Sequence, residues 1–82
     1  MELQLTIRSR EGVLFTDTVQ SLTAKNSSGT FDILPQHEDF ITLVDESVAV
    51  TTSQGQRITI PISNALLKVS RNQVSIYLGI RK

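Results

Sequence analysis

The sequence predicts an all-β fold, a flattened β-sandwich or barrel of about eight to ten short, mostly antiparallel strands. Valine, isoleucine and threonine supply 24 of the 82 residues, whereas alanine supplies only three. β-Branched side chains suit a pleated, half-buried surface and disfavour helices. Turn-forming residues recur roughly every eight to twelve positions, which is typical of sandwiches and barrels. No segment has helical periodicity, so no C-terminal helical hairpin is expected.

The length and composition set broad limits on the function. A chain of 82 residues accommodates a single domain, 1–82. The absence of cysteine excludes a disulfide framework and a thiolate zinc site. No leader-like segment opens the sequence, and no apolar run is long enough to span a membrane. Eight basic and eight acidic side chains cancel, which argues against a general nucleic-acid-binding protein.

The charges are unevenly distributed along the chain. Residues 1–50 hold three basic and eight acidic groups, a net charge of −5. Residues 51–82 hold five basic groups and no acid, a net charge of +5. Either the two halves interleave in one sandwich and neutralise each other, or a basic face is offered to an acidic partner.

Five segments of the first half have the alternating or apolar pattern of strands. They are residues 3–8, 13–15, 19–24, 30–34 and 40–44. Imperfect alternation after Val19 indicates a bulge. The polar run from Asn26 to Gly29 is a turn by composition. Pro35 ends the strand before it, because proline has no N–H to donate to a sheet. The core residues expected in this region are Phe31, Ile33, Leu34 and Phe40.

Four further strands are expected in the second half, at residues 48–51, 57–62, 65–70 and 73–80. Gln54-Gly55 is a hairpin signal between the first two of them. Arg71-Asn72 is a two-residue hairpin loop between the last two. Pro61 places its strand at a sheet edge or at a bulge.

No catalytic or metal site can be assembled from the residues. The four glycines are isolated, so no phosphate-cradling loop is present. A serine nucleophile would depend on His37, the single histidine. Adjacent side chains in His37-Glu38-Asp39 point to opposite sides of an extended chain, and metal ligands normally come from separated positions. Glu38-Asp39 and Asp45-Glu46 are interpreted as solvated turn residues. The sequence therefore indicates binding rather than catalysis, with no cofactor.

A longer pattern is more specific. Glu11-Gly12-Val13-Leu14-Phe15 is followed, after a strand, by GTFDILPQHEDFITLV from Gly29 to Val44. This resembles the N-terminal β-sandwich domain of the epsilon subunit of F-type ATP synthases, with its pattern G-x-F/L-G-I-L-P-G-H-x-x-F/L-I-T-x-L. The hairpin from Ala65 to Val74 is also similar, so the resemblance covers essentially the whole chain. The residues that match the long pattern in order are Gly29, Phe31, Ile33, Leu34, Pro35, His37, Phe40, Ile41 and Thr42.

The chain departs from the family pattern mainly at glycines. Asp32 and Gln36 stand where the family prefers glycine. Asp45-Glu46-Ser47 replaces a family Pro-Gly, and Ser63-Asn64 replaces paired glycines. The run PQHEDF is similar to the P-R-H-x-D-F of the sodium-translocating-type variant branch. The chain is therefore identified as a divergent member.

The resemblance implies a non-catalytic rotor subunit in the central stalk of a rotary F-type ATP synthase or ATPase. Such a subunit links the gamma subunit to the membrane rotor ring during proton- or sodium-coupled ATP synthesis. The implied location is peripheral, on the cytoplasmic face of the inner membrane or its organellar equivalent, with membrane contact only through the complex. A stand-alone β-sandwich adaptor or ligand-binding module is the alternative.

Family members usually continue into two C-terminal α-helices that inhibit ATP hydrolysis and, in some bacteria, bind ATP. This sequence stops at Arg81-Lys82. The resemblance therefore implies coupling without inhibition, and no ATP binding, for these 82 residues.

The resemblance also implies two sets of contact residues. The family often has an acidic residue at the position of Thr30, and Asp32 lies two residues along, on the same strand face. Asp32 is therefore expected to meet a rotor arginine in its place. The expected rotor-ring contacts are Ser28, Gly29, Thr30 and Asp32. The expected gamma-subunit contacts are His37, Asp39 and Thr42.

Overall fold

Eight β-strands form the regular structure of the residues that the computed structural model describes, which are 2–36, 38–62 and 64–79. All-β architecture is thus confirmed, with the strand number at the lower end of the expected range. Within the described residues, no helix is long and apolar enough to cross a membrane. The strands are β1 (Leu3–Ser9), β2 (Gly12–Asn26), β3 (Gly29–Ile33), β4 (Phe40–Val44), β5 (Ser47–Thr52), β6 (Arg57–Pro61), β7 (Ala65–Ser70) and β8 (Gln73–Tyr77).

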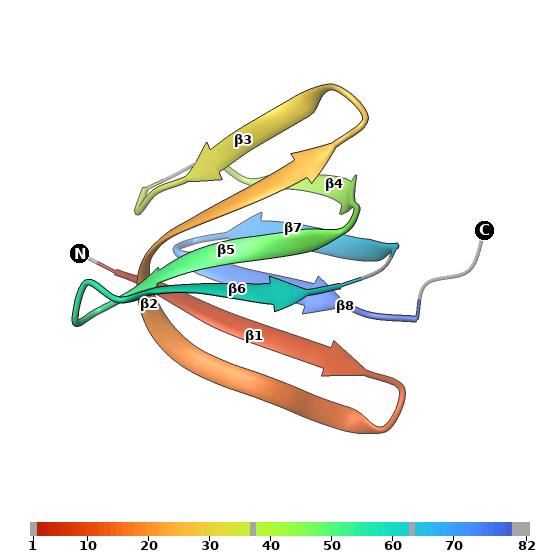
Figure 1. Ribbon diagram of the computed structural model, residues 1–82, viewed down its shortest axis with the longest axis horizontal. Helices are drawn as coiled ribbons and strands as arrows, with labels where there is room; N and C mark the ends of the chain where they lie inside the picture. Colours follow the sequence, from red (N-terminus) through yellow and green to blue (C-terminus); the bar gives the residue numbers. More distant parts are fainter. Residues whose placement is uncertain (1, 37, 63, 80–82) are drawn as a thin grey trace.

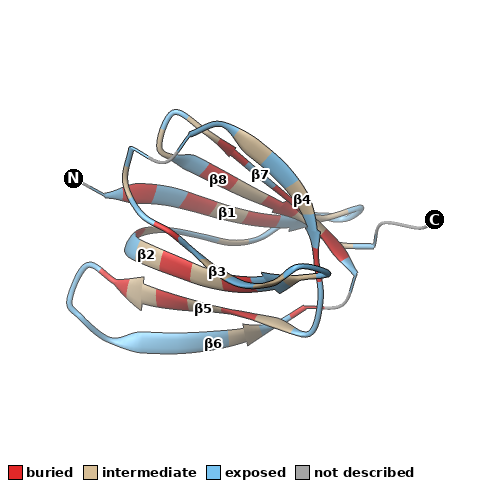
Figure 2. Cartoon of the chain, turned by 90° about the horizontal axis from the view of Figure 1, so that it is seen from above, coloured by how far each residue is buried: buried red, intermediate tan, exposed pale blue. Residues whose placement is uncertain are grey.

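One curled sheet folds over into two layers (Figures 1 and 2). The strand order is β4-β7-β8-β1-β2-β5-β6, and β3 also pairs with β2. All pairings are antiparallel except that of β1 with β8. The first half of β2 pairs with β1 in one layer, and its second half pairs with β3 and β5 in the other. β2 therefore joins the two layers of the sandwich.

The sequence pattern divided β2 into two strands, which is wrong. The strand runs without a break for 15 residues, from the hairpin with β1 to the hairpin with β3 (Figure 1). The polar stretch that separated the two segments, residues 16–18, lies on the exposed part of the strand. The expected bulge is confirmed, because the register with β5 shifts between Val19 and Ser21. Bulges bend a strand, and this one lies where β2 passes between the layers.

The core lies between the two layers and is aliphatic (Figure 2). In β1, β5 and β7 every second side chain is buried, and these side chains fill the core from both sides. Phe15, Phe31 and Phe40 are partly buried and pack against it. The buried hydrophobic residues are Leu3, Leu5, Ile7, Val19, Leu22, Ala24, Ile33, Val44, Val48, Val50, Ile62, Ala65, Leu67, Val69, Val74 and Ile76.

Two expectations need correction, one about the core and one about the end of the last strand. Leu34 was expected inside but is 57% exposed, because β3 ends at Ile33 and the chain turns at Pro35 and Gln36. The last strand was expected to reach residue 80, but β8 ends at Tyr77. The expected edge position of Pro61 is confirmed, because it is the last residue of β6, and β6 ends the strand order.

The two oppositely charged halves of the sequence interleave in the fold. The strand order places β7 and β8, from the basic half, between β4 and β1, from the acidic half. Arg57 and Lys68 lie on β6 and β7, near opposite ends of that order. The arrangement favours mutual neutralisation over a single basic face.

Candidate binding surface at the β2–β3 hairpin

Three of the expected rotor-ring contacts lie at the tip and start of the β2–β3 hairpin. Ser28 lies in the turn, Gly29 begins β3 opposite Asn26, and Thr30 follows opposite Lys25. The turn is closed locally, because the Ser28 N–H donates to Asn26 Oδ1 over 2.9 Å. Asparagine favours turns through this kind of bond to the backbone two residues on. The polar run of the sequence thus becomes a short, exposed projection.

Asp32, the fourth expected ring contact, lies further along β3. It is exposed, and so is Thr30, so both residues lie on the outer face of the strand, as expected from their spacing. Thr23, directly opposite on β2, donates its hydroxyl to Asp32 Oδ1 over 2.6 Å. This bond leaves the other carboxylate oxygen available and holds the charge at a fixed place on the surface.

The expected gamma-subunit contacts lie around the start of β4. Asp39 is exposed just before the strand. Thr42 is half-buried, and its Oγ1 accepts a hydrogen bond of 3.1 Å from Asn26 Nδ2. Thr42 therefore fastens β4 to the end of β2 and offers only part of its surface to a partner. His37 lies outside the described residues.

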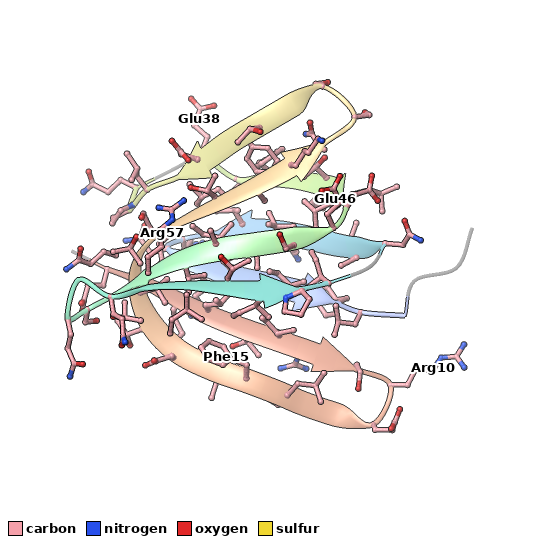
Figure 3. The ribbon with its side chains drawn as sticks, in the orientation of Figure 1. Arg10, Phe15, Glu38, Glu46 and Arg57 are labelled. Atoms are coloured by element: carbon pink, nitrogen blue, oxygen red, sulfur yellow. The ribbon has the colours of Figure 1, made fainter. Side chains whose placement is uncertain are left out.

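A hollow of about 470 Å³ brings members of both contact sets together. The hairpin forms one wall and the segment from Glu38 to Phe40 forms the other. The rings of Phe31 and Phe40 meet edge to face beside it, with centroids 5.4 Å apart. Glu38 projects from the outer end of this region (Figure 3). The residues lining the hollow are Asn26, Ser28, Gly29, Thr30, Phe31, Glu38, Asp39 and Phe40.

The polar side chains of the described residues were compared with the needs of a metal site. No three His, Asp, Glu or Cys side chains among them cluster closely enough to hold a metal ion. Every buried side-chain nitrogen or oxygen in the described part of the chain has a hydrogen-bond partner. The ion pair between Lys25 and Glu46, at 3.5 Å, is largely exposed and contributes little stability. What remains is a polar, partly aromatic surface suited to contact.

An apolar surface on β4 was missed by the sequence reasoning. Ile41 and Leu43 are 60% and 47% exposed. Leu43 pairs with Leu66 on β7, which in turn pairs with Tyr77 on β8 and then Arg8 on β1. Residues directly opposite each other on paired strands share a sheet face. These side chains therefore form a row across the outer face of the layer that contains β1.

A signal for this surface was present in the sequence. Residues 40–44 are apolar at four of five positions rather than alternating. Such a run indicates a strand that is covered on both faces, whereas the sandwich covers only the face that carries Val44. The outward face of β4 is therefore suited to a partner.

A comparison against protein families agrees with the observed fold. Residues 2–78 match the model of the ATP synthase delta/epsilon chain, β-sandwich domain. The chain belongs to this family. The match spans all eight strands and every expected contact residue.

Relatives in the family support the assignment. The chain is 32% identical over 77 residues to the ATP synthase epsilon chain of a Sulfurovum species, covering 92% of this chain and 60% of the relative. It is 32% identical over 76 residues to that of Gloeobacter violaceus, covering 93% and 58%. It is 26% identical over 79 residues to the chloroplastic epsilon chain of Pinus koraiensis, covering 96% and 58%. The chain thus spans about 60% of the length of these relatives.

Solved structures show the same fold. A chain of the Euglena gracilis mitochondrial ATP synthase, OSCP/F1/c-ring, superposes with a TM-score of 0.86 at 19% identity, covering 94% of this chain and 50% of that one. A chain of the Tetrahymena thermophila mitochondrial ATP synthase central stalk and c-ring superposes with a TM-score of 0.74 at 10% identity, covering 95% and 63%. The two-layer arrangement therefore persists at low sequence identity.

Proposed function

We propose that this chain is a non-catalytic subunit of the central stalk of a rotary ATP synthase, where it joins the gamma subunit to the membrane rotor ring. The observation that carries the proposal is the family match over residues 2–78, which coincides with the whole sandwich. A subunit that transmits torque needs a rigid body with attachment surfaces rather than an active site. The sandwich, with its aliphatic core and exposed contact surfaces, meets that requirement.

The ring contact in this proposal is the β2–β3 hairpin. Its tip is exposed and polar, and Asp32 carries a charge held in place by Thr23. A polar loop of the ring with an arginine would pair with this carboxylate. The proposed location is peripheral to the membrane, at the cytoplasmic face or its organellar equivalent, where the ring loops are accessible.

The gamma contact in this proposal is the surface of β4 and the segment before it. Exposed apolar side chains of this kind commonly mark a protein interface, and Ile41 and Leu43 supply them. Asp39 is exposed just before the strand. The half-buried Thr42 lies on the opposite face of β4, towards Asn26 of β2, and offers only part of its surface. Because Asp39 shares a hollow with Ser28 and Thr30, the two proposed attachment surfaces adjoin rather than lying on opposite sides.

Reconstitution with a gamma subunit and rotor rings tests the function. We expect the chain to co-purify with the gamma subunit and the complex to bind purified rings at low salt. Replacing Asp32 with alanine should weaken ring binding by about 2- to 10-fold and leave gamma binding unchanged, because exposed charge pairs contribute about 0.2–1 kcal/mol and somewhat more with good geometry.

The matched control is Asp17→Ala, which removes an exposed acid from the other half of β2. It should leave both affinities unchanged. Failure of the wild-type chain to co-purify with gamma would overturn the proposed function. Undiminished ring binding by the Asp32 variant at low salt would overturn only the assigned role of that carboxylate.

A further inference from the structure

Asn72 lies far from the proposed contacts in sequence, yet it bonds to two other segments of the chain. It is the second residue of the Arg71-Asn72 loop between β7 and β8. Its carbonyl oxygen accepts a hydrogen bond of 2.8 Å from the Gln4 N–H at the start of β1. Its side-chain Oδ1 accepts a hydrogen bond of 2.5 Å from the Gln36 N–H in the connection from β3 to β4. One residue thus ties together a hairpin, the first strand and a loop.

The loop that receives this bond leads directly to the proposed gamma surface. It connects Ile33, the end of β3, to Phe40, the start of β4, and carries Glu38 and Asp39. Leu34, Glu38 and Asp39 are all exposed, so apolar burial contributes little to holding the loop in place. Gln36 also has a φ of 68°, a left-handed conformation that is unfavourable for a residue other than glycine. The hydrogen bond from the Gln36 N–H to Asn72 Oδ1 therefore helps to hold this loop in its conformation.

We propose that Asn72 is a positioning residue, which holds the β3–β4 loop in its binding geometry through Oδ1 without itself contacting the partner. The inference rests on the proposed function, since the partner is taken to be the gamma subunit. The bond spans 36 residues of sequence and joins the loop to a hairpin built on β7 and β8. Loss of the acceptor would loosen the loop at Gln36 while leaving the two layers paired.

Two substitutions at this position separate the side-chain bond from the shape of the turn. Both loop residues have positive φ, 52° at Arg71 and 62° at Asn72, as in a type I′ hairpin. Glycine adopts this conformation readily and lacks the acceptor. Aspartate tolerates it and keeps an oxygen at the same place. Asn72→Gly therefore removes the bond and keeps the turn, and Asn72→Asp keeps both.

The first measurement is amide hydrogen exchange in the 82-residue chain, which needs no partner. We expect Gln36 to exchange about 2- to 10-fold faster in Asn72→Gly, because a typical hydrogen bond contributes about 0.5–1.5 kcal/mol. Asn72→Asp should restore the protection of Gln36. The Gln4 amide, which bonds to the backbone of residue 72, should be unaffected by either change. Unchanged Gln36 exchange in the glycine variant would overturn the proposal.

The second measurement is the Kd for the gamma subunit. We expect Asn72→Gly to raise it by a factor similar to the change in exchange and Asn72→Asp to leave it near the wild-type value. Faster exchange with an unchanged Kd would overturn the positioning role in binding. If the wild-type chain did not bind gamma, the proposed function would fail, and the exchange result would still decide whether Asn72 holds the loop.

Discussion

At single residues, this chain keeps a left-handed backbone at several positions where its family pattern has glycine. Three positions where the pattern has glycine, Gln36, Glu46 and Asn64, have φ values of 68°, 68° and 50°. Glycine is the usual residue at such positions, because it lacks the Cβ that crowds a left-handed backbone. The sequence indicated a turn at Asp45-Glu46. It did not reveal that the turns keep a left-handed conformation without glycine.

Arg71 offers a direct test of this strain. Its φ of 52° is unfavourable for arginine, and its side chain is exposed. Asparagine is among the preferred residues at the first position of a type I′ hairpin. We expect Arg71→Asn to stabilise the chain by about 0.5 kcal/mol and to raise Tm by about 2–4 °C, measured by thermal unfolding.

The matched control at the same position is Arg71→Val. A β-branched residue is a conformational outlier at positive φ. This variant should lower the stability by about 1 kcal/mol or more. Equal Tm values for the two variants would show that the backbone at this turn relaxes without cost.

At the scale of elements, β2 determines the architecture. It pairs with β1 in one layer and with β3 and β5 in the other. Side chains of Gln20 and Ser53 fix the crossing point, because Gln20 Nε2 donates to the Ser53 carbonyl and Ser53 Oγ donates to the Thr18 carbonyl, each over 3.1 Å. The two layers are thus linked by one continuous backbone as well as by core packing.

Leu22 is the residue through which β2 contributes most clearly to the core. It is fully buried and lies between Ile33 on β3 and Val50 on β5. We expect Leu22→Ala to lower the free energy of unfolding by about 2–5 kcal/mol in urea titrations, since it removes buried methyl groups and leaves a cavity. Leu14→Ala is the control, because Leu14 is 61% exposed on the same strand and its truncation should change stability by no more than about 0.5 kcal/mol. A loss below about 1 kcal/mol for Leu22→Ala would argue against a tightly packed crossing.

The strands also show how much of the fold could be predicted from the sequence. Seven strands were located to within a residue or two at most ends, because alternation and turn residues are local signals. The continuity of β2 was missed, since a polar stretch on an exposed face looks like a loop when the register is unknown. Leu34 was misplaced for a similar reason: hydrophobicity alone does not tell where a strand ends. The meeting of Ser28 with Asp39 in one hollow depends on tertiary folding, which no local pattern encodes.

At the scale of the whole molecule, the proposed role is attachment without regulation. The regular elements of the described residues are all strands. We expect these 82 residues, added to a gamma-containing catalytic complex, to leave its ATP hydrolysis rate unchanged while binding to it. The measurement is steady-state ATPase activity at saturating chain. Strong inhibition would mean that the sandwich itself obstructs rotation, and the proposed passive role would be wrong.

The parallel pairing of β1 with β8 has a consequence for folding during synthesis on the ribosome. Leu5 and Ile7 face Val74 and Ile76 across this pair, so the first and the last of the described strands along the chain lie side by side. During synthesis the chain emerges β1 first, and one edge of that strand stays without its partner until β8 has left the ribosome. Non-local pairing of this kind slows folding, and an unpaired strand edge invites association with other chains. β1 is therefore made before the other described strands but gains its last partner only with β8, and until then its free edge is open to association with other chains.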